Sequence, residues 1–142
     1  MRVDSSCVVT YMTDSVIAII QARMGSSRLP GKSMAKIGER TIIEYVLRRV
    51  ERASRVSSVV VAISNNPKDD ILEKHVQQLG YTVHRGSEDD VLERFYNAAK
   101  PFNPVAVVRI TGDCPLVSCE LIDLAIDRFF KDEVDYLSLI HI

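Results

Sequence analysis

The residues best suited to chemistry lie in a short basic segment that is rich in small residues. The segment QARMGSSRLPGK places three cations, Arg23, Arg28 and Lys32, among small residues that include Gly25 and Ser27. Backbone N–H groups beside small residues can approach a phosphate closely, and the cations neutralise its charge. The segment therefore predicts an anion-binding loop. The alternative is a solvated surface loop whose basic side chains bind nothing.

The glycines of this segment resemble a P-loop without matching its spacing. Five residues separate Gly25 from the pair Gly31 and Lys32, whereas the P-loop motif has four residues there. A P-loop helix would also begin at the lysine, but the next helix start that the sequence predicts is the capping pair Thr41 and Glu44. These differences argue against a P-loop kinase or ATPase. The dinucleotide-binding pattern G-x-G-x-x-G is absent.

A carboxylate follows the third strong apolar run, in the segment VAVVRITGDCPL. Asp113 comes after Thr111 and Gly112 where this strand should end, and an aspartate there can hold Mg²⁺ against a nucleotide phosphate. The alternative is an Asx turn closed by the same side chain. We favour the metal role because the basic segment follows another strand of the same predicted sheet. Arg109 faces either the crevice or an internal partner, and the sequence leaves this open.

The elements that must position these residues alternate between strands and helices. Apolar runs typical of buried strands cover residues 16–20, 58–63 and 105–110, and a shorter strand is expected near 81–84. Helices are predicted behind the capping residues Thr41, Asn66, Ser87 and Ser118. This alternation predicts a three-layer α/β domain with a mostly parallel sheet. Ligands bind beyond the carboxyl ends of such strands, so the basic segment and Asp113 should open onto one crevice.

Composition narrows the class of protein. The 142 residues suit one domain, and 46% hydrophobic with 26% charged residues is globular rather than disordered. No apolar run is long enough to cross a bilayer. A net charge of −1 gives the chain no strong electrostatic attraction to nucleic acid. We therefore expect neither a membrane nor a nucleic-acid partner. Three cysteines without metal-type spacing favour a reducing, cytoplasmic location.

Both ends of the chain look different from the middle. Residues 1–15 lack the long apolar region of a signal peptide, and we expect an N-terminal extension with translation starting at Met12. Residues 16–137 form the expected domain. The tail 138–142, SLIHI, is atypical, and the hypothesis is that the domain is C-terminally incomplete.

Three motifs together resemble one family. QARMGSSRLPGK after an apolar strand, RGSEDDVLERF and RITGDCPL resemble the cytidylyltransferases that activate sugars, including the acylneuraminate and 3-deoxy-manno-octulosonate enzymes. The likeness runs from Val16 to about Asp135 and is strongest to the spore-coat polysaccharide biosynthesis branch. It implies a Rossmann-like nucleotide-diphospho-sugar transferase fold. It also implies Mg²⁺-dependent attack of a sugar acid on CTP, giving a CMP-sugar and pyrophosphate.

The resemblance also implies roles for individual residues. Ala22 would lie against the base, Thr111 would lie close to the nucleotide, and Asp113 would bind Mg²⁺. Arg23 and Lys32, with Asp113, are the expected catalytic residues. The full nucleotide-binding set is Ala22, Arg23, Gly25, Ser27, Arg28, Lys32, Arg85, Ser87 and Thr111.

Family members continue past this C-terminus with a sugar-acid pocket, a second magnesium-binding Asp and usually a dimerisation element, so a homodimer is expected for the full-length form. Two other functions remain open. One is a nucleotide-sugar-dependent glycosyltransferase of related fold, although many of these carry a D-x-D motif and this sequence has none. The other is an inactive nucleotide-binding fragment.

Overall fold

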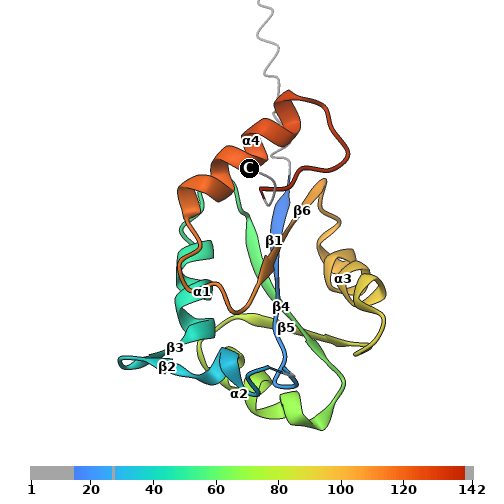
Figure 1. Cartoon of the computed structure of the whole chain (residues 1–142). Helices are drawn as coiled ribbons and strands as arrows, with labels where there is room; N and C mark the ends of the chain where they lie inside the picture. Colours follow the sequence, from blue (N-terminus) through green and yellow to red (C-terminus); the bar gives the residue numbers. More distant parts are fainter. Residues whose placement is uncertain (1–14, 27, 140–142) are drawn as a thin grey trace, which may run out of the picture.

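The computed structural model describes residues 15–26 and 28–139. At its centre is a four-stranded sheet with the order β5-β4-β1-β6, in which every neighbouring pair is parallel (Figure 1). The strands are β1 (Val16–Gln21), β4 (Ser58–Ser64), β5 (Thr82–Gly86) and β6 (Ala106–Thr111). The predicted parallel sheet is therefore confirmed. The expected extension before residue 15, the start at Met12, residues 140–142 of the tail and the candidate Ser27 lie outside the described residues.

Four helices surround the sheet in the described part of the chain. They are α1 (Ile42–Val50), α2 (Asp70–Gln78), α3 (Val91–Ala99) and α4 (Cys119–Lys131). Short 3₁₀ turns, η1 (Lys32–Met34), η2 (Pro67–Asp69) and η3 (Lys100–Phe102), and a small hairpin of β2 (Lys36–Ile37) and β3 (Arg40–Thr41) complete the connections. Neither the hairpin nor the 3₁₀ turns were predicted from the sequence. No described helix is long and apolar enough to span a membrane.

The predicted caps are correct except at α3. The side chains of Thr41, Asn66 and Ser118 accept backbone N–H bonds at the starts of α1, η2 and α4. Helix α3 is instead capped by Asp90, which accepts from the N–H of Glu93 at 2.8 Å. Ser87 accepts from the N–H of Asp90 at 3.0 Å, so it closes the turn before the helix. The correction arises because several polar residues compete for the cap in this acidic segment.

Alternating side chains of β1 face the two layers of helices. Ala18 and Ile20 pack in the core with α1, α2 and α4, whereas Ile17 and Ile19 pack with α3 (Figure 1). All four are fully buried, which explains why β1 is apolar on both faces rather than alternating. The result is the expected three-layer α/β arrangement, with β1 held at the centre of the sheet.

Candidate active site

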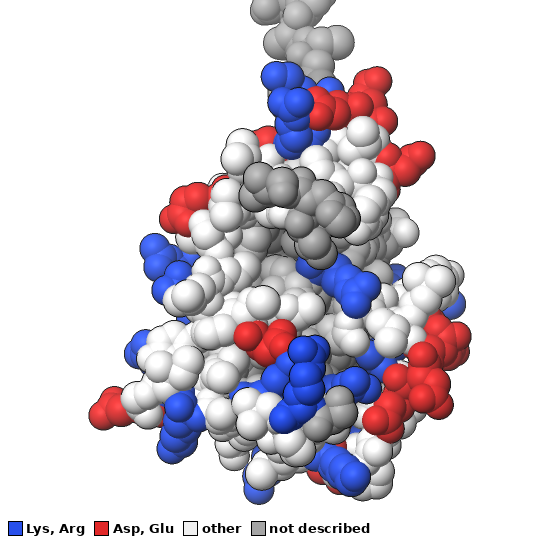
Figure 2. Space-filling view, viewed as in Figure 1, with Lys and Arg blue, Asp and Glu red and all other residues white. Residues whose placement is uncertain are grey.

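A cavity of about 280 Å³ opens where β1 and β6 end. It is lined by residues from the loop after β1 and from the turn after β6, so the two segments predicted to share a crevice do share one. The lining residues are Gln21, Ala22, Arg23, Ser26, Arg28, Lys32, Ser33, Arg109, Thr111, Gly112 and Asp113. Figure 2 shows Lys and Arg side chains gathered on the lower part of the molecular face in view, over the loop that follows β1.

Close backbone contact brings the two strand ends together. The N–H of Gly112 donates to the carbonyl of Gln21 at 2.8 Å. A Cβ atom at Gly112 would lie 2.8 Å from the Cβ of Ala22 and 3.1 Å from the Cδ1 of Ile43. Only glycine fits this approach without displacing its neighbours. Asp113 is thereby placed directly beside the basic loop.

The loop after β1 folds back on itself through Met24. The carbonyl of Met24 accepts from the N–H groups of Ser26 at 3.0 Å and Gly31 at 2.9 Å. Gly31 has a φ of +71°, a conformation that glycine adopts without strain, and η1 begins at the next residue. This return of the chain carries Lys32 back to the mouth of the cavity.

Lys32 and Asp113 form an ion pair across the cavity, and each side chain is one-third exposed. The hydrogen bond from Lys32 holds the pKa of Asp113 below its ordinary value. Arg23 and Arg28 are exposed at the cavity and form no ion pair with any described residue. The cavity lining therefore presents to an anion the ammonium group of Lys32 and three guanidinium groups without an ion pair among the described residues, those of Arg23, Arg28 and Arg109. A triphosphate is the kind of ligand that such a set can neutralise.

The donors at the cavity fit a metal ion that is shared with a phosphate. Asp113 supplies the only carboxylate among the described lining residues, and no cluster of three or more His, Cys, Asp or Glu side chains occurs in the described part of the chain. Mg²⁺ is commonly held by one or two carboxylates with substrate phosphates and water completing its coordination. A single carboxylate beside cations fits that arrangement and not a preformed metal cage.

Three of the predicted nucleotide residues lie away from the cavity lining. Arg85 donates from Nη1 to Asp70 and Glu73, both at 2.7 Å, and these bonds raise its pKa. Ser87 closes the turn before α3, and Gly25 also lies outside the lining. The structure thus brings together Ala22, Arg23, Arg28, Lys32, Thr111 and Asp113. The roles assigned to all of these residues stay predictions.

Arg109, whose direction the sequence left open, faces the cavity. Its Nη2 donates to Oε1 of Gln21 at 3.1 Å, and its guanidinium lies 5.4 Å from the ring centre of Phe95. Gln21 and Ser33 also line the cavity and were not singled out from the sequence. The alternation of side chains along β6 was the available signal, because it places Arg109 on the same face as Thr111.

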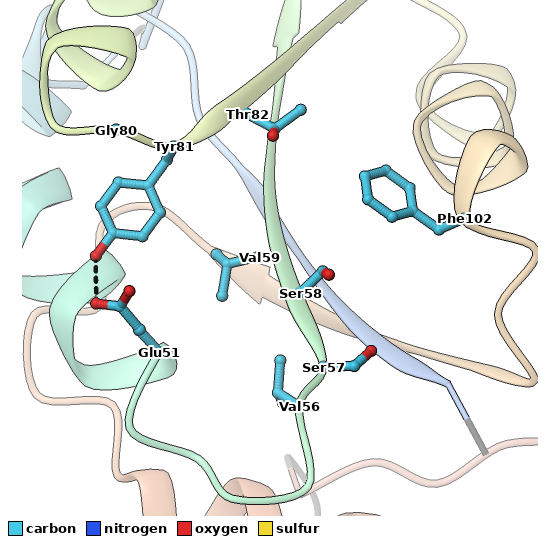
Figure 3. Close-up of a pocket in the computed structure, with 9 residues that line it drawn as sticks. All are labelled: Glu51, Val56, Ser57, Ser58, Val59, Gly80, Tyr81, Thr82 and Phe102. Atoms are coloured by element: carbon cyan, nitrogen blue, oxygen red, sulfur yellow. Dashed lines mark hydrogen bonds between the residues drawn. The ribbon is translucent and has the colours of Figure 1, made fainter. Parts of the chain in front are cut away.

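A second cavity, of about 250 Å³, lies at the opposite end of the sheet (Figure 3). Tyr81 points toward α1, and its hydroxyl donates to Oε2 of Glu51 at 2.7 Å. Burial, together with this bond, raises the pKa of Tyr81 to about 12. No lysine or arginine lines this cavity among the described residues. It therefore lacks the charges that a phosphate site requires.

Comparison with known proteins identifies the family to which the chain belongs. Residues 17–141 match the family model described as Cytidylyltransferase. The chain belongs to the cytidylyltransferase family. The uncharacterized protein MJ1063 of Methanocaldococcus jannaschii is 44% identical over 123 residues, which are 87% of this chain and 51% of MJ1063.

Two named relatives extend the comparison. The spore coat polysaccharide biosynthesis protein SpsF of Bacillus subtilis is 37% identical over 132 residues, covering 90% of this chain and 55% of SpsF. The 3-deoxy-manno-octulosonate cytidylyltransferase of Leptospira interrogans is 37% identical over 116 residues, covering 79% of this chain and 45% of that enzyme. This cytidylyltransferase chain thus spans about half the length of the curated relatives it matches.

Solved structures confirm the fold. A cytidylyltransferase from Leptospira borgpetersenii superposes with a TM-score of 0.79 and 39% identity, covering 84% of this chain and 50% of the other. A CMP:2-keto-3-deoxy-manno-octonic acid synthetase complexed with CTP gives a TM-score of 0.75 at 24% identity, covering 84% of this chain and 49% of the synthetase chain. The cytidylyltransferase chain therefore has the Rossmann-like nucleotidyltransferase fold that its motifs predicted.

Proposed function

We propose that this cytidylyltransferase-family chain carries the nucleotide site of an enzyme that activates a sugar acid with CTP, giving a CMP-sugar and pyrophosphate for surface polysaccharide synthesis. The observation that carries the proposal is the cavity at the ends of β1 and β6. It combines three loop cations, Arg23, Arg28 and Lys32, with the single carboxylate of Asp113. The relative named for 3-deoxy-manno-octulosonate supports the choice of a sugar acid, and the relative named for spore-coat polysaccharide supports a role in polysaccharide synthesis.

Four charged residues at the cavity have proposed tasks. Arg23, Arg28 and Lys32 neutralise the triphosphate, and Lys32 exchanges its partner Asp113 for a phosphate oxygen when the nucleotide binds. Asp113, once released, holds Mg²⁺. When bound, Mg²⁺ supplies charge that favours departure of pyrophosphate. Positioning and charge neutralisation of this kind are what phosphoryl-group chemistry requires from a protein.

The remaining assignments follow the family resemblance. Ala22 lies near the base through its backbone, and Thr111 stands close to the nucleotide. Gly25, Ser27, Arg85 and Ser87 complete the proposed nucleotide set; for Arg85 this requires rearranging its bonds to Asp70 and Glu73.

The proposed transfer joins the anomeric oxygen of the sugar acid to the α-phosphorus of CTP. The bond from that phosphorus to the bridging oxygen of the β-phosphate breaks, the electron pair leaves with pyrophosphate, and the hydroxyl proton passes to solvent. Since this chain covers about half of its relatives, residues that bind the sugar acid are expected in the part of those proteins that it does not match. A homodimer and a cytoplasmic location are likewise proposals, the second supported by the free thiols of Cys114 and Cys119.

Calorimetric titration of the 142-residue chain tests the nucleotide site directly. CTP is titrated with Mg²⁺ and with EDTA, and ATP and UTP serve as matched controls. Mg²⁺-dependent binding that prefers CTP supports the proposal. A folded chain that binds ATP or UTP as tightly as CTP contradicts the assignment to cytidine. If CTP binds and no sugar acid supports release of pyrophosphate, the chain has a binding role alone.

A further inference from the structure

A buried carboxylate outside the cavity is tied to the loop after β1. Asp69, at the end of η2, is 1% exposed, and its two oxygens accept three hydrogen bonds. The N–H of Met24 donates to Oδ1 at 2.7 Å, while the N–H and hydroxyl of Ser64 donate to Oδ2 at 3.0 Å and 2.5 Å. We infer that Asp69 is a positioning residue that fixes the loop after β1 for phosphate binding. The inference rests on the proposed function, since it assumes that this loop holds the nucleotide.

The choice of an aspartate at this position has a physical reason. Burying a carboxylate is costly unless its oxygens are hydrogen-bonded, so a residue with only a packing role would be apolar. An ionised carboxylate accepts on both oxygens and donates nothing, which matches three converging donors. A neutral amide of the same shape would turn one N–H donor toward another. The site is therefore specific for the charged side chain.

The bond to Met24 anchors the loop after β1 at the residue where the chain folds back. Met24 is held on both sides, because its N–H is bound by Asp69 and its carbonyl accepts from Ser26 and Gly31. Arg23 directly precedes this fixed point, and Lys32 directly follows Gly31. Asp69 therefore connects the end of β4 with the segment that carries the cavity cations, across 45 residues of sequence.

The charge of Asp69 also acts on the buried guanidinium group of Arg94. Arg94 is 3% exposed, and its Nη1 donates to the carbonyl of Ser87. Burial lowers the pKa of Arg94 and Arg23 lowers it further, whereas Asp69 and Glu88 raise it. Without a negative charge at Asp69, less attraction would offset the repulsion between the like charges of Arg23 and Arg94. The charge of Asp69 thus offsets part of the cost of burying Arg94 beside other cations.

The substitution Asp69→Asn separates positioning from folding. The amide oxygen is expected to stay with the two donors of Ser64, which turns the NH₂ group toward the N–H of Met24. The matched control Ser64→Ala removes one donor from the same carboxylate, and the acceptor of the Asn66 N–H, but leaves the bond to Met24 intact. Both variants are expected to unfold at lower temperature. Only Asp69→Asn is expected to weaken Mg²⁺·CTP binding, by about tenfold or more.

Binding is measured calorimetrically at a temperature where near-ultraviolet circular dichroism shows each variant to be folded, and amide hydrogen exchange of Met24 is measured by NMR. Faster exchange at Met24 and weaker CTP binding in Asp69→Asn alone support the inference. Unchanged CTP binding in Asp69→Asn, or an equal loss in Ser64→Ala, overturns it.

Two further outcomes distinguish a failure of this inference from a failure of the proposed function and from a variant that does not fold. If the wild-type chain binds no CTP, the proposed function fails at this chain, and Met24 exchange still decides whether Asp69 holds the loop. If Asp69→Asn does not fold, the wild-type chain supplies the test. The Met24 amide should then be far better protected than that of Leu29, whose N–H donates to the Ser26 hydroxyl at 3.4 Å in an exposed part of the same loop. Equal exchange at the two amides overturns the inference.

Discussion

The substitution Asp113→Asn removes the one carboxylate that lines the cavity among the described residues. Its effect on stability should be small, because Lys32 and Asp113 are each one-third exposed and solvent screens their attraction. A loss of about 1 kcal/mol or less in the free energy of unfolding is expected at neutral pH. The Lys32 hydrogen bond lowers the folded-state pKa of Asp113, so this contribution is present above the unfolded-state value of 3.8. It should disappear as the pH falls through the lower folded-state pKa.

The effect on nucleotide binding should be larger and should depend on the metal. In EDTA, loss of the Asp113 charge removes repulsion of the triphosphate, about 1 kcal/mol for two charges 4 Å apart in water, and frees Lys32 from its partner. CTP should therefore bind the variant up to about fivefold more tightly than the wild type. With Mg²⁺, the wild type gains a charge-assisted contact of about 2 kcal/mol, or about thirtyfold, that the variant lacks. The stimulation by Mg²⁺ should fall from about thirtyfold to near one.

Calorimetric titration with CTP, in Mg²⁺ and in EDTA, measures both effects in one set of samples. Asp127→Asn is the matched control, because Asp127 is an ion-paired acid with the same charge change, bound to Arg55 at 3.0 Å outside the cavity lining. The control should keep the wild-type response to Mg²⁺. If Asp113→Asn keeps it as well, Asp113 does not hold the metal and the reasoning is refuted.

Three further predictions address other parts of the molecule. Arg23→Ala should weaken CTP binding by about 1.5–3 kcal/mol in calorimetry with little change in melting temperature, since Arg23 is exposed; unchanged affinity would contradict its role. Gly112→Ala should lower the free energy of unfolding by about 1–3 kcal/mol in a thermal melt, because the added Cβ would overlap neighbouring atoms. Gly25→Ala should cost less, since the atom nearest to its added Cβ would be 3.7 Å away. Equal losses in the two variants would argue against the close approach at Gly112. Tyr81 should titrate near pH 12 in ultraviolet absorbance, and the free energy of unfolding should fall as the pH rises from 10 to 12, since its folded-state pKa is raised from 10.0. Glu51→Gln should lower the pKa of Tyr81 only in part because burial is the larger cause, and a return to 10.0 would show that the hydrogen bond dominates.

Local patterns in the sequence were sufficient for the main elements. The run Val16–Ile20 predicted a buried strand because its residues are apolar at every position, and the structure places it at the centre of the sheet. Thr41, Asn66 and Ser118 predicted helix or turn starts because a cap bonds to backbone groups two or three residues away. Such features depend on neighbours in sequence and can therefore be predicted without the fold.

The location of the site could be predicted from the sequence because parallel strands end at the same edge of a sheet. The basic loop and Asp113 share a cavity for that reason, and the motifs alone indicated the family. The sequence did not reveal which side chains had partners already. Arg85 was expected near the nucleotide, yet its guanidinium binds Asp70 and Glu73, which lie on a different element.

What the sequence by itself determined is the order of elements, the charge of the loop and the position of Asp113 at a strand end. What only the tertiary structure decided is the set of contacts between residues distant in sequence. These contacts are the Lys32–Asp113 pair, the approach of Gly112 to Ala22 and the bond from Met24 to Asp69. Asp69 is an ordinary acidic residue before a helix when judged by sequence. Its importance arises because folding buries it where three donors converge, and the hydrogen bonds that they donate offset the cost of burying the carboxylate.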